Sequence, residues 1–405
     1  MSTAPAGALA RFRVLELGST IAAPFCGRLL ADFGAEVIKV EDCNGDPLRS
    51  LGRACNGQSL YAATLFRNKQ LAAIDLRKAE GQALVCRLAA KSDVVIENFR
   101  PGALEQWGLG YEQLQAVRPG LVMVRISGFG QTGPYRHRAG YGIVGEAVSG
   151  LRYLNGDPDR PPARNATALT DYITGLYAAF GAVLALLHRQ LTGQGQMIDA
   201  ALYEGAFSFV EPFVPLYDKL GIVAQRSGSR MPDATPNNLY PTRDGDWIHI
   251  AAFADHMFRD LCALMGRSEL AADERFATLA SRNRHPEPID AAIAEWTITR
   301  DLADLEAALH ELSIPATRIF SMADIFRDPH FAARAMLAEV ADPHLGTVRL
   351  AAPVPRLSAT PGAIRHAGRR IGEDTSRVLR DVAEAGEDEI ATLHAAGVVF
   401  CAERR

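Results

Sequence analysis

The chain has 405 residues, of which 48% are hydrophobic and 22% charged, and its formal net charge at pH 7 is -4. This composition is typical of a globular protein, and the length exceeds the size at which one hydrophobic core usually stops growing, so we expect two domains. Charges of both signs are interspersed without the basic stripe that nucleic acid requires, which argues against a nucleic acid partner.

Neither a targeting segment nor a metal site is expected. Met1 to Ala10 lacks a cationic region followed by an apolar block, and we find no apolar run of the roughly 18 residues that span a membrane, so we expect a cytoplasmic protein. The ten histidines show no ligand spacing. The six cysteines have no close pairs, so they are expected to be reduced packing residues, at Cys26, Cys43, Cys55, Cys86, Cys262 and Cys401.

The first part of the chain alternates between strands and helices. A strand is predicted at 13–17, a turn at 18–24, a helix at 25–33 and a second strand at 36–41. This βαβ order predicts a Rossmann-like α/β domain with a parallel sheet. The turn lacks the G-x-G-x-x-G pattern that brings backbone close to a pyrophosphate, which disfavours a nicotinamide or flavin cofactor.

The alternation continues with strands at 71–76, 94–97 and 121–126 and helices at 78–90 and near 114–117. Two loops, Asn98–Gly102 and Ser127–Pro134, directly follow strands. Ligands bind at the carboxyl ends of strands in open α/β sheets, so these loops are the first candidates for a binding site.

The stretch Ala166–Gly205 contains an acidic residue, Asp171, at the start of a long apolar run. From Tyr172 to Gln190 the apolar residues are nearly continuous, which predicts a helix buried on every side, and the glycines after Thr192 predict its end. Asp171 stands where an N-cap belongs, facing the positive end of the helix dipole, which favours its ionised form. It is therefore either a functional anion or a helix cap only.

The remainder of the chain predicts a smaller α+β domain. Gln225–Asn238 is polar and lacks periodicity, which indicates a linker or mobile loop. A hairpin is predicted around 242–246, followed by helices at 255–265, 288–297 and 302–312. We predict a discontinuous large domain at 1–224 and 328–405, a small domain at 239–320, and linkers at 225–238 and 321–327.

Six segments resemble the class III CoA-transferases, the CaiB/BaiF-type family that includes formyl-CoA:oxalate and carnitine CoA-transferases. The resemblance is collinear from Phe12 to Val399. Its markers are LLADFGAEVIKVE (29–41), IDLRKAEG (74–81), DVVIENFRPGALEQWGLGYEQL (93–114), SGFGQTGP (127–134), TALTDYITGLYAAFGAVLAL (167–186) and TGQGQMIDAALYE (192–204). It implies an interlocked homodimer and a catalytic aspartate at Asp171.

The resemblance also implies a mechanism and a set of CoA contacts. An aspartate carboxylate can hold the acyl group and then CoA covalently, so that the thioester is never lost to water. No cofactor beyond the CoA thioester substrate and no metal is implied. The contacts implied by resemblance are Thr20, Ile21, Ala22, Ile74, Asp75, Leu76, Arg77, Asn98, Phe99, Arg100 and Tyr141. Arg77 and Arg100 are candidate phosphate ligands or, alternatively, solvated surface residues.

Four departures from the formyl-CoA enzyme argue against oxalate or formate as substrates. Ile21 replaces a glutamine beside the nucleophile, Gly142 replaces a glutamate, and Asp42 replaces an arginine near CoA. Residues 227–232 replace a glycine-run loop. Three arginines, Arg138, Arg226 and Arg230, are candidates to bind a second carboxylate. We therefore expect succinyl-CoA as the donor and a short dicarboxylate of the malate, citramalate, mesaconate or itaconate type as the acceptor.

Two alternatives to transfer between different acids remain open. The first is an α-methylacyl-CoA racemase-like reaction, in which a histidine and an aspartate exchange an α-proton. Tyr141 stands at the position of that histidine, and a phenol is a poor base at neutral pH. The second is intramolecular CoA transfer between two carboxylates of one molecule. A CoA-binding protein of the same fold without catalysis is disfavoured by the retained Asp171 motif.

Overall fold

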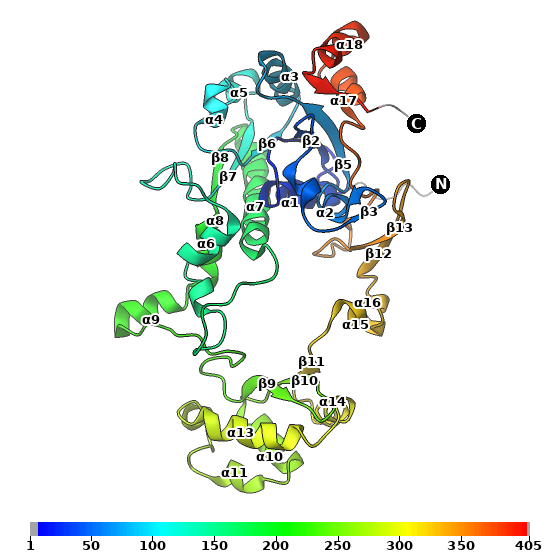
Figure 1. Ribbon diagram of the computed structural model, residues 1–405. Coiled ribbons are helices and arrows are strands. Elements are labelled where there is room, and N and C mark those ends of the chain that lie inside the picture. The colour runs from blue at the N-terminus through cyan, green and yellow to red at the C-terminus, as the bar shows by residue number, and fades with distance from the viewer. Residues whose placement is uncertain (1–6, 403–405) are drawn as a thin grey trace. The chain divides into compact units, whose positions relative to one another are not determined.

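The computed structural model of the chain describes residues 7–402 (Figure 1). Residues 1–6 and 403–405 lie outside this range, and with them most of the stretch Met1 to Ala10 and both ends of the predicted large domain. Contacts divide the chain into two compact units, 1–151 with 165–215 and 332–405, and 152–164 with 216–331. The predicted small domain, 239–320, falls inside the second unit, which also takes 152–164, 216–224 and 328–331 from the predicted large domain.

The larger unit contains a seven-stranded sheet. Its order is β14-β5-β2-β1-β6-β7-β8, and every neighbouring pair is parallel except β14 with β5. The predicted α/β class is confirmed, and the antiparallel β14 is a correction, since an edge strand has one neighbour and can pair in either direction. The strands are β1 (Arg13–Glu16), β2 (Glu36–Glu41), β5 (Lys69–Ile74), β6 (Val94–Glu97), β7 (Val122–Ser127), β8 (Met197–Ala201) and β14 (Val399–Phe400).

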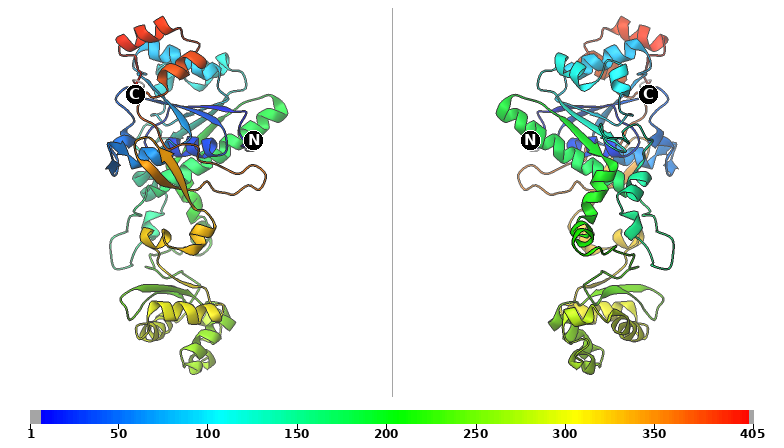
Figure 2. Two further views of the ribbon diagram at one scale, coloured as in Figure 1. Left: turned by 90° about the vertical axis from the view of Figure 1, so that its right-hand side faces the viewer. Right: turned by 90° about the vertical axis from the view of Figure 1, so that its left-hand side faces the viewer.

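Helices cover both faces of this sheet (Figures 1 and 2). Alternate residues of a strand point to opposite faces, so Leu15 packs into one core and Val14 into the other. The core containing Val14 lies under helices α1 (Ala22–Asp32) and α7 (Leu169–Thr192). The core containing Leu15 lies under α3 (Ala79–Ala90), α5 (Tyr111–Val117), α17 (Thr375–Asp381) and α18 (Glu387–Ala395).

Helix α7 differs from its prediction at the start and on its surface. Its N-cap is Ala168, so Asp171 is the third helical residue and not the cap, because its own backbone is already helical. Gly193 ends the helix with φ 77°, as predicted. The expectation of burial on every side is wrong: small residues such as Ala178 and Ala182 face the core, whereas Phe180 is 59% exposed.

α7 is also long and apolar enough to cross a membrane by length and composition, which corrects the expectation that no run of this kind exists. Half of its most apolar window, 50%, is buried inside the structure, where it packs against α1 and the sheet. This is the environment of a core helix, with one apolar face left exposed.

The second unit contains a three-stranded antiparallel sheet, ordered β11-β10-β9. The predicted hairpin is confirmed: β9 (Asn237–Pro241) pairs with β10 (Trp247–Ala251), and Thr242 N donates to Asp246 O across the turn. β11 (Ala316–Arg318) pairs with β10. Helices pack on this sheet around Tyr240, Ile248 and Phe258. They are α10 (Asp255–Leu264), α11 (Ser268–Ala272), α12 (Leu279–Arg282), α13 (Pro286–Thr297) and α14 (Leu302–Glu311).

Shorter elements connect these cores, and the sequence analysis did not predict them. They include the antiparallel pairs β3 (Ala54–Cys55) with β4 (Gln58–Ser59) and β12 (Leu337–Asp342) with β13 (Gly346–Ala351). The helices are η1 (Pro47–Ser50), α2 (Leu60–Leu65), α4 (Ala103–Gln106), α6 (Gly142–Val148), η2 (Arg152–Leu154), α8 (Leu202–Phe207), η3 (Ser208–Val210), α9 (Phe213–Leu220), α15 (Met322–Ile325) and α16 (Pro329–Ala333).

The strand order places a topological switch between β1 and β6. From β1 the chain proceeds to β2 and β5 on one side, and then returns to β6, β7 and β8 on the other. The connections after β1 and β6 therefore leave the sheet in opposite directions, which opens a crevice at the carboxyl ends of these two strands.

Candidate active site

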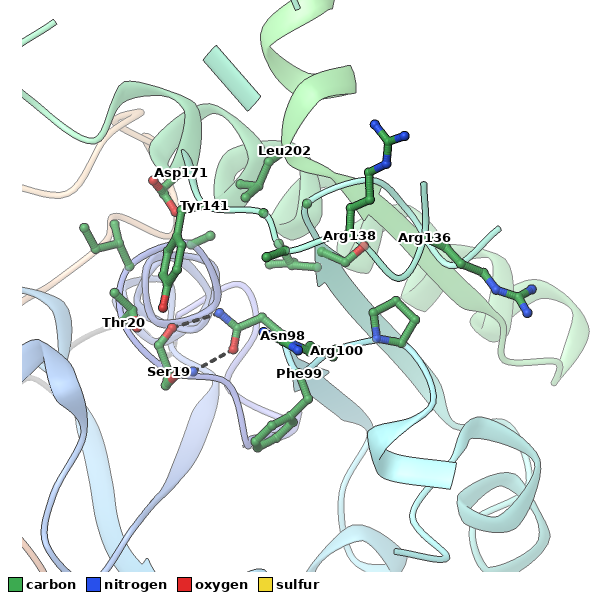
Figure 3. A pocket seen from close by; sticks show the side chains of 18 residues that line it. Ser19, Thr20, Asn98, Phe99, Arg100, Arg136, Arg138, Tyr141, Asp171 and Leu202 are labelled. Atoms are coloured by element: carbon green, nitrogen blue, oxygen red, sulfur yellow. Dashed lines mark hydrogen bonds between the residues drawn. The ribbon is translucent and has the colours of Figure 1, made fainter. Parts of the chain in front are cut away.

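A cavity of about 200 Å³ lies at this crevice (Figure 3). It is formed by the loops that follow β1, β6 and β7, together with the first turn of α7 and the residues that precede α6. The lining residues are Ser19, Thr20, Ile21, Ala22, Asn98, Phe99, Arg100, Pro101, Ile126, Ser127, Gly128, Arg136, Arg138, Ala139, Gly140, Tyr141, Asp171 and Leu202.

Side chains from outside the loop hold the backbone of the loop after β1. The Asn98 amide accepts from Ser19 N at 2.8 Å and donates to Ser19 O at 2.9 Å, as the dashed lines in Figure 3 show. Asp46 accepts from Thr20 N at 3.0 Å, and Thr20 has a left-handed φ of 68° that is uncommon for threonine. The Lys39 ammonium donates to the Gly18 carbonyl at 2.7 Å. Three consecutive residues of the loop are thus fixed.

The charges beneath this loop are buried. Lys39 Nζ lies 2.9 Å from Asp46 Oδ2 and 3.4 Å from Glu16 Oε1, and these side chains are 0% to 1% exposed. Burial alone raises the pKa of an acid, but the Lys39 charge and backbone N–H donors hold the pKa of Asp46 below its usual value. Removing one member leaves an uncompensated buried charge, which costs about 3–5 kcal/mol.

The Asp171 carboxylate lies against Gly142, the first residue of α6. A Cβ built on Gly142 would be 1.9 Å from Asp171 Oδ2. Tyr141 precedes Gly142, its side chain is 71% exposed, and it lines the same cavity as Asp171 (Figure 3). The carboxylate is half-buried, at the edge between the protein interior and the cavity.

The first cavity is rich in cations. Three arginines line it, and Asp171 is the one carboxylate among its described lining residues. The Arg138 guanidinium stacks on the ring of Tyr135, with its central carbon 3.5 Å from the ring centroid. Arg136 Nε lies 2.9 Å from His137 Nε2. Arg100 lines the same cavity. The cavity therefore suits anions.

Arg136 and Arg138 belong to a loop, 129–139, that is closed at its base by two glycines. A Cβ on Gly128 would be 2.8 Å from the Cα of Gly140, and a Cβ on Gly140 would be 2.7 Å from the Cα of Gly128. The two backbones approach more closely than any other residue type permits, so the loop begins and ends at one point.

A second cavity of about 260 Å³ adjoins the first and shares Ser19 and Phe99 with it. Arg77 lies there, but its guanidinium is bound to Asp75 at 2.7 Å and to Asp42 at 3.0 Å. The Arg77 hydrogen bond holds the pKa of Asp75 below its usual value. The other lining residues are Leu17, Val40, Glu41, Gly45, Asp46, Pro47, Ile74, Leu76 and Trp107. With four acids and one arginine, this cavity suits neutral or hydroxyl-bearing groups better than phosphates.

The residues singled out from the sequence fall into three groups. Of the twelve residues formed by Asp171 and the expected CoA contacts, eight line the first cavity and the other four line the second, which Phe99 also lines. Arg138 lines the first cavity as well. Arg226 and Arg230 lie in the second unit, where Arg230 binds Glu287 and Asp290. Within residues 7–402 there is no group of three or more His, Cys, Asp or Glu side chains arranged to hold a metal.

Sequence reasoning missed several residues that shape the site. Asp46 and Lys39 carried no recognisable signal, because their contacts with residues 18–20 exist only after folding. Arg136 was not singled out, although it precedes Arg138 by two positions in the same loop. Asn98 was expected to contact CoA, but both polar atoms of its side chain are bound to Ser19.

The strand order and the cavity at the switch between β1 and β6 are typical of α/β enzymes that bind nucleotide-containing ligands. The chain belongs to CoA-transferase family III, whose model matches residues 9–375. It is a CoA-transferase. It is 48% identical to the succinyl-CoA–D-citramalate CoA-transferase of Chloroflexus aurantiacus, over 96% of this chain and 97% of that protein.

Two further likenesses cover similar lengths. The chain is 39% identical to the succinyl-CoA–L-malate CoA-transferase alpha subunit of Chloroflexus aurantiacus, over 96% of this chain and 92% of that one. It also resembles the crystal structure of a CaiB/BaiF family protein from Brucella suis, with a TM-score of 0.84 and 35% identity, over 93% of this chain and 100% of that chain. The family named from the sequence motifs is confirmed.

We predict that Asn98→Ala will lower kcat/KM by about a hundredfold, because a displacement of about 1 Å at a reacting centre has an effect of this size. Loss of the two bonds to Ser19 should also cost about 1–3 kcal/mol in the free energy of unfolding. Steady-state kinetics and urea denaturation measure both.

The matched control is Asn283→Ala. Its amide holds Thr235 N at 3.0 Å and Asp233 O at 2.8 Å in the second unit, in the same manner. Equal losses of kcat/KM in the two variants would contradict a specific role for Asn98 in the cavity.

Proposed function

We propose that the enzyme transfers CoA from succinyl-CoA to a short dicarboxylic acid through a thioester on Asp171. The observation that carries this proposal is the position of Asp171, the sole carboxylate among the described lining residues of a cavity that three arginines also line. The relatives that act on D-citramalate and L-malate support the choice of acids.

The reaction proceeds in four balanced steps. An Asp171 oxygen attacks the acyl carbon of succinyl-CoA, and the C–S bond breaks to give a mixed anhydride and CoA thiolate. The thiolate then attacks the Asp171 carbonyl carbon, and succinate leaves. An oxygen of the acceptor carboxylate attacks that same carbon and expels the thiolate again. The thiolate finally attacks the acceptor's acyl carbon, which forms the new acyl-CoA and restores the Asp171 carboxylate.

Each addition creates an oxyanion that requires preorganised donors, and backbone N–H groups of the glycine-containing loops are the candidates. Ile21 offers no side-chain donor, so the backbone N–H groups of Ile21 and Ala22 take that role in our proposal, since the N–H of Thr20 is bound to Asp46. The fixed position of this loop supports it, because donors contribute most when they need no reorganisation during the reaction. No cofactor beyond the CoA thioester is proposed.

The charge of the two cavities suggests how CoA is divided between them. The acidic second cavity, at residues 74–77, suits the adenine and ribose, and the cationic first cavity suits the phosphates and the acyl group. Arg100 is the proposed phosphate ligand. Arg77, already bound by two carboxylates, is less suited to that role than its sequence position indicates.

Of the three arginines considered for the second carboxylate, Arg138 is the one that lines the cavity with Asp171. Figure 3 shows its guanidinium turned away from Asp171, where it stacks on Tyr135. An exposed cation–π contact is worth about 0.5–1 kcal/mol, whereas hydrogen bonds to a charged carboxylate are worth about 1.5–3 kcal/mol. Exchanging the ring for a carboxylate is therefore favourable, and we propose Arg138 as the dicarboxylate ligand.

We also propose a cytoplasmic, interlocked homodimer, as in the resembling family. Its support is the apolar face of α7 within the larger unit, which lacks cover in the single chain. The exposed residues are Leu176, Tyr177, Phe180, Val183, Leu184, Leu187 and Leu191.

We predict that light scattering after size exclusion will give twice the 43.8 kDa of one chain, and that Phe180→Asp will shift the mass toward that of one chain. A wild-type mass of 43.8 kDa would contradict the dimer.

We predict that Asp171→Asn will fold normally and lose at least about a thousandfold in kcat, because removal of a covalent nucleophile has effects of this order. Incubation of the wild type with succinyl-CoA followed by borohydride should reduce the thioester and convert Asp171 to homoserine, which peptide mass spectrometry detects. Asp388→Asn, an exposed residue of α18, is the control.

Other outcomes separate the alternatives. Deuterium uptake at the α-carbon of a 2-methylacyl-CoA without homoserine formation indicates a racemase-like reaction. Movement of CoA between the two carboxylates of a single isotopically marked diacid, without exchange into added free acid, indicates intramolecular transfer. Turnover retained in Asp171→Asn contradicts the aspartyl thioester itself.

We predict that Arg138→Gln will lower succinyl-CoA/succinate exchange about 10- to 100-fold and leave butyryl-CoA/butyrate exchange little changed. The two pairs differ by a terminal carboxylate against a methyl group, and the CoA portion is identical. Exchange of isotopically labelled acid into the thioester measures both. Arg53→Gln, at an exposed arginine that lines neither cavity, is the control. Equal loss with both pairs means that Arg138 serves CoA instead.

A further inference from the structure

Gly142 occupies a position where glycine is unfavourable for the local structure. It is the first residue of helix α6, and glycine is a poorer helix former than alanine, by about 1 kcal/mol where the residue lies inside a helix. It is absent from the glycines of left-handed φ, so its backbone conformation is open to any residue. It is also buried. Neither helix formation nor backbone strain explains why residue 142 is glycine. The remaining explanation is that another group occupies the space that a side chain would fill.

That space is occupied by the carboxylate of Asp171. A Cβ on Gly142 would lie 1.9 Å from Oδ2, 2.9 Å from Cγ and 3.5 Å from Oδ1. Real Cβ atoms do not approach heavy atoms closer than 3.0 Å, so Oδ2 would have to move by at least 3.0 minus 1.9, or 1.1 Å. The Oδ2 atom of Asp171 in α7 thus occupies the space that a side chain at position 142 of α6 would fill.

The frame on both sides of this contact is rigid. Helix α7 is fixed by packing of its small inward residues, including Gly175, whose Cβ would be 2.7 Å from the Ala22 carbonyl. Helix α6 packs just as tightly, since a Cβ on Gly145 would be 3.0 Å from Leu202 Cβ and 3.1 Å from Thr170 Cγ2. The two helices cannot easily separate to make room for a methyl group at position 142, so the Asp171 carboxylate would have to move.

We propose that Gly142 is a positioning residue for the nucleophile: the absence of its side chain sets where Asp171 Oδ2 lies in the cavity. This inference rests on the proposed role of Asp171 in forming the covalent intermediate. A nucleophile held in one place loses no rotamer freedom when it attacks, and a shift of about 1 Å costs about a hundredfold in rate. Gly142 itself contacts no reacting atom of the substrate in this proposal.

The first test is Gly142→Ala, with Gly145→Ala as the matched control in the same helix. Gly142→Ala should lower kcat for succinyl-CoA by about a hundredfold and change KM by less than about threefold, because substrate binding is retained while attack geometry is lost. Gly145→Ala disturbs the packing of α6 and not the carboxylate, so its kcat should fall far less. Equal losses of kcat in both variants, or kcat retained in Gly142→Ala, overturn the proposal.

The second test measures the clash directly and remains informative if Gly142→Ala folds poorly. The unfolding temperature is compared for Gly142→Ala in the wild-type chain and in the Asp171→Ala chain. With the carboxylate removed, the added methyl group has room and alanine is the better helix former, so the substitution should lower the unfolding temperature less or even raise it. The same decrease in both backgrounds overturns the proposal.

These outcomes are distinct from a failure of the covalent mechanism. If Asp171→Asn keeps its turnover, the nucleophile is wrongly assigned whatever Gly142 does. If Asp171→Asn is inactive and Gly142→Ala is as active as the wild type, the covalent mechanism stands and only the positioning role is lost.

Discussion

The site depends on hydrogen bonds between the loops after β1 and β6, the two strands at which the strand order of the sheet reverses. β1 and β6 are neighbours, but their following loops diverge, and the Asn98 amide joins them through the N–H and carbonyl of Ser19. Without it, the side-chain hydrogen bonds to the loop after β1 described above would be those from Asp46 and Lys39. Because the cavity floor consists of these loops, the geometry offered to a thioester follows from this link and from the buried charges beneath it.

The distribution of charge gives the two adjoining cavities different chemical characters. Among the described lining residues of one cavity, three arginines accompany a single carboxylate, Asp171. In the other cavity, Asp75 and Asp42 bind the sole arginine among the described lining residues. A substrate with a charged and an uncharged end can therefore bind in one orientation. Orientation of this kind matters for the proposed CoA transfer, because the thiolate leaves one carbonyl carbon of the mixed anhydride and must then attack the neighbouring one.

The sequence was informative where structure depends on local patterns. The strands at 36–41 and 94–97 were predicted with their observed bounds, since runs of β-branched residues there admit few alternatives. The start of α7 was misplaced by three residues, because Asp171 suits both a cap and the first helical turn. The exposed apolar face of α7 was predicted to be buried in the core. Composition alone does not tell whether an apolar face is covered by the same chain, covered by another chain or exposed to solvent.

Features that depend on long-range contacts left no local signal. Gly142 and Asp171 are far apart in the sequence, and neither residue type alone indicates that one fills the space left by the other. Asp46 resembles any acid in a turn, yet it holds Thr20 in a left-handed conformation. Asn98 was recognised as part of the site from the family motif, but its role in holding Ser19 becomes clear only from the hydrogen bonds.

The loop 129–139 has a consequence for how such enzymes diverge. Its two ends meet at Gly128 and Gly140, so residues can be added, removed or exchanged in between without moving β7 or Tyr141. A closed loop of this kind adds little entropy cost as it lengthens. In the proposed roles of Arg138 and Asp171, selection for a new acid can therefore act on the tip of this loop while Asp171 and its surroundings stay unchanged, so that acid preference evolves separately from catalysis.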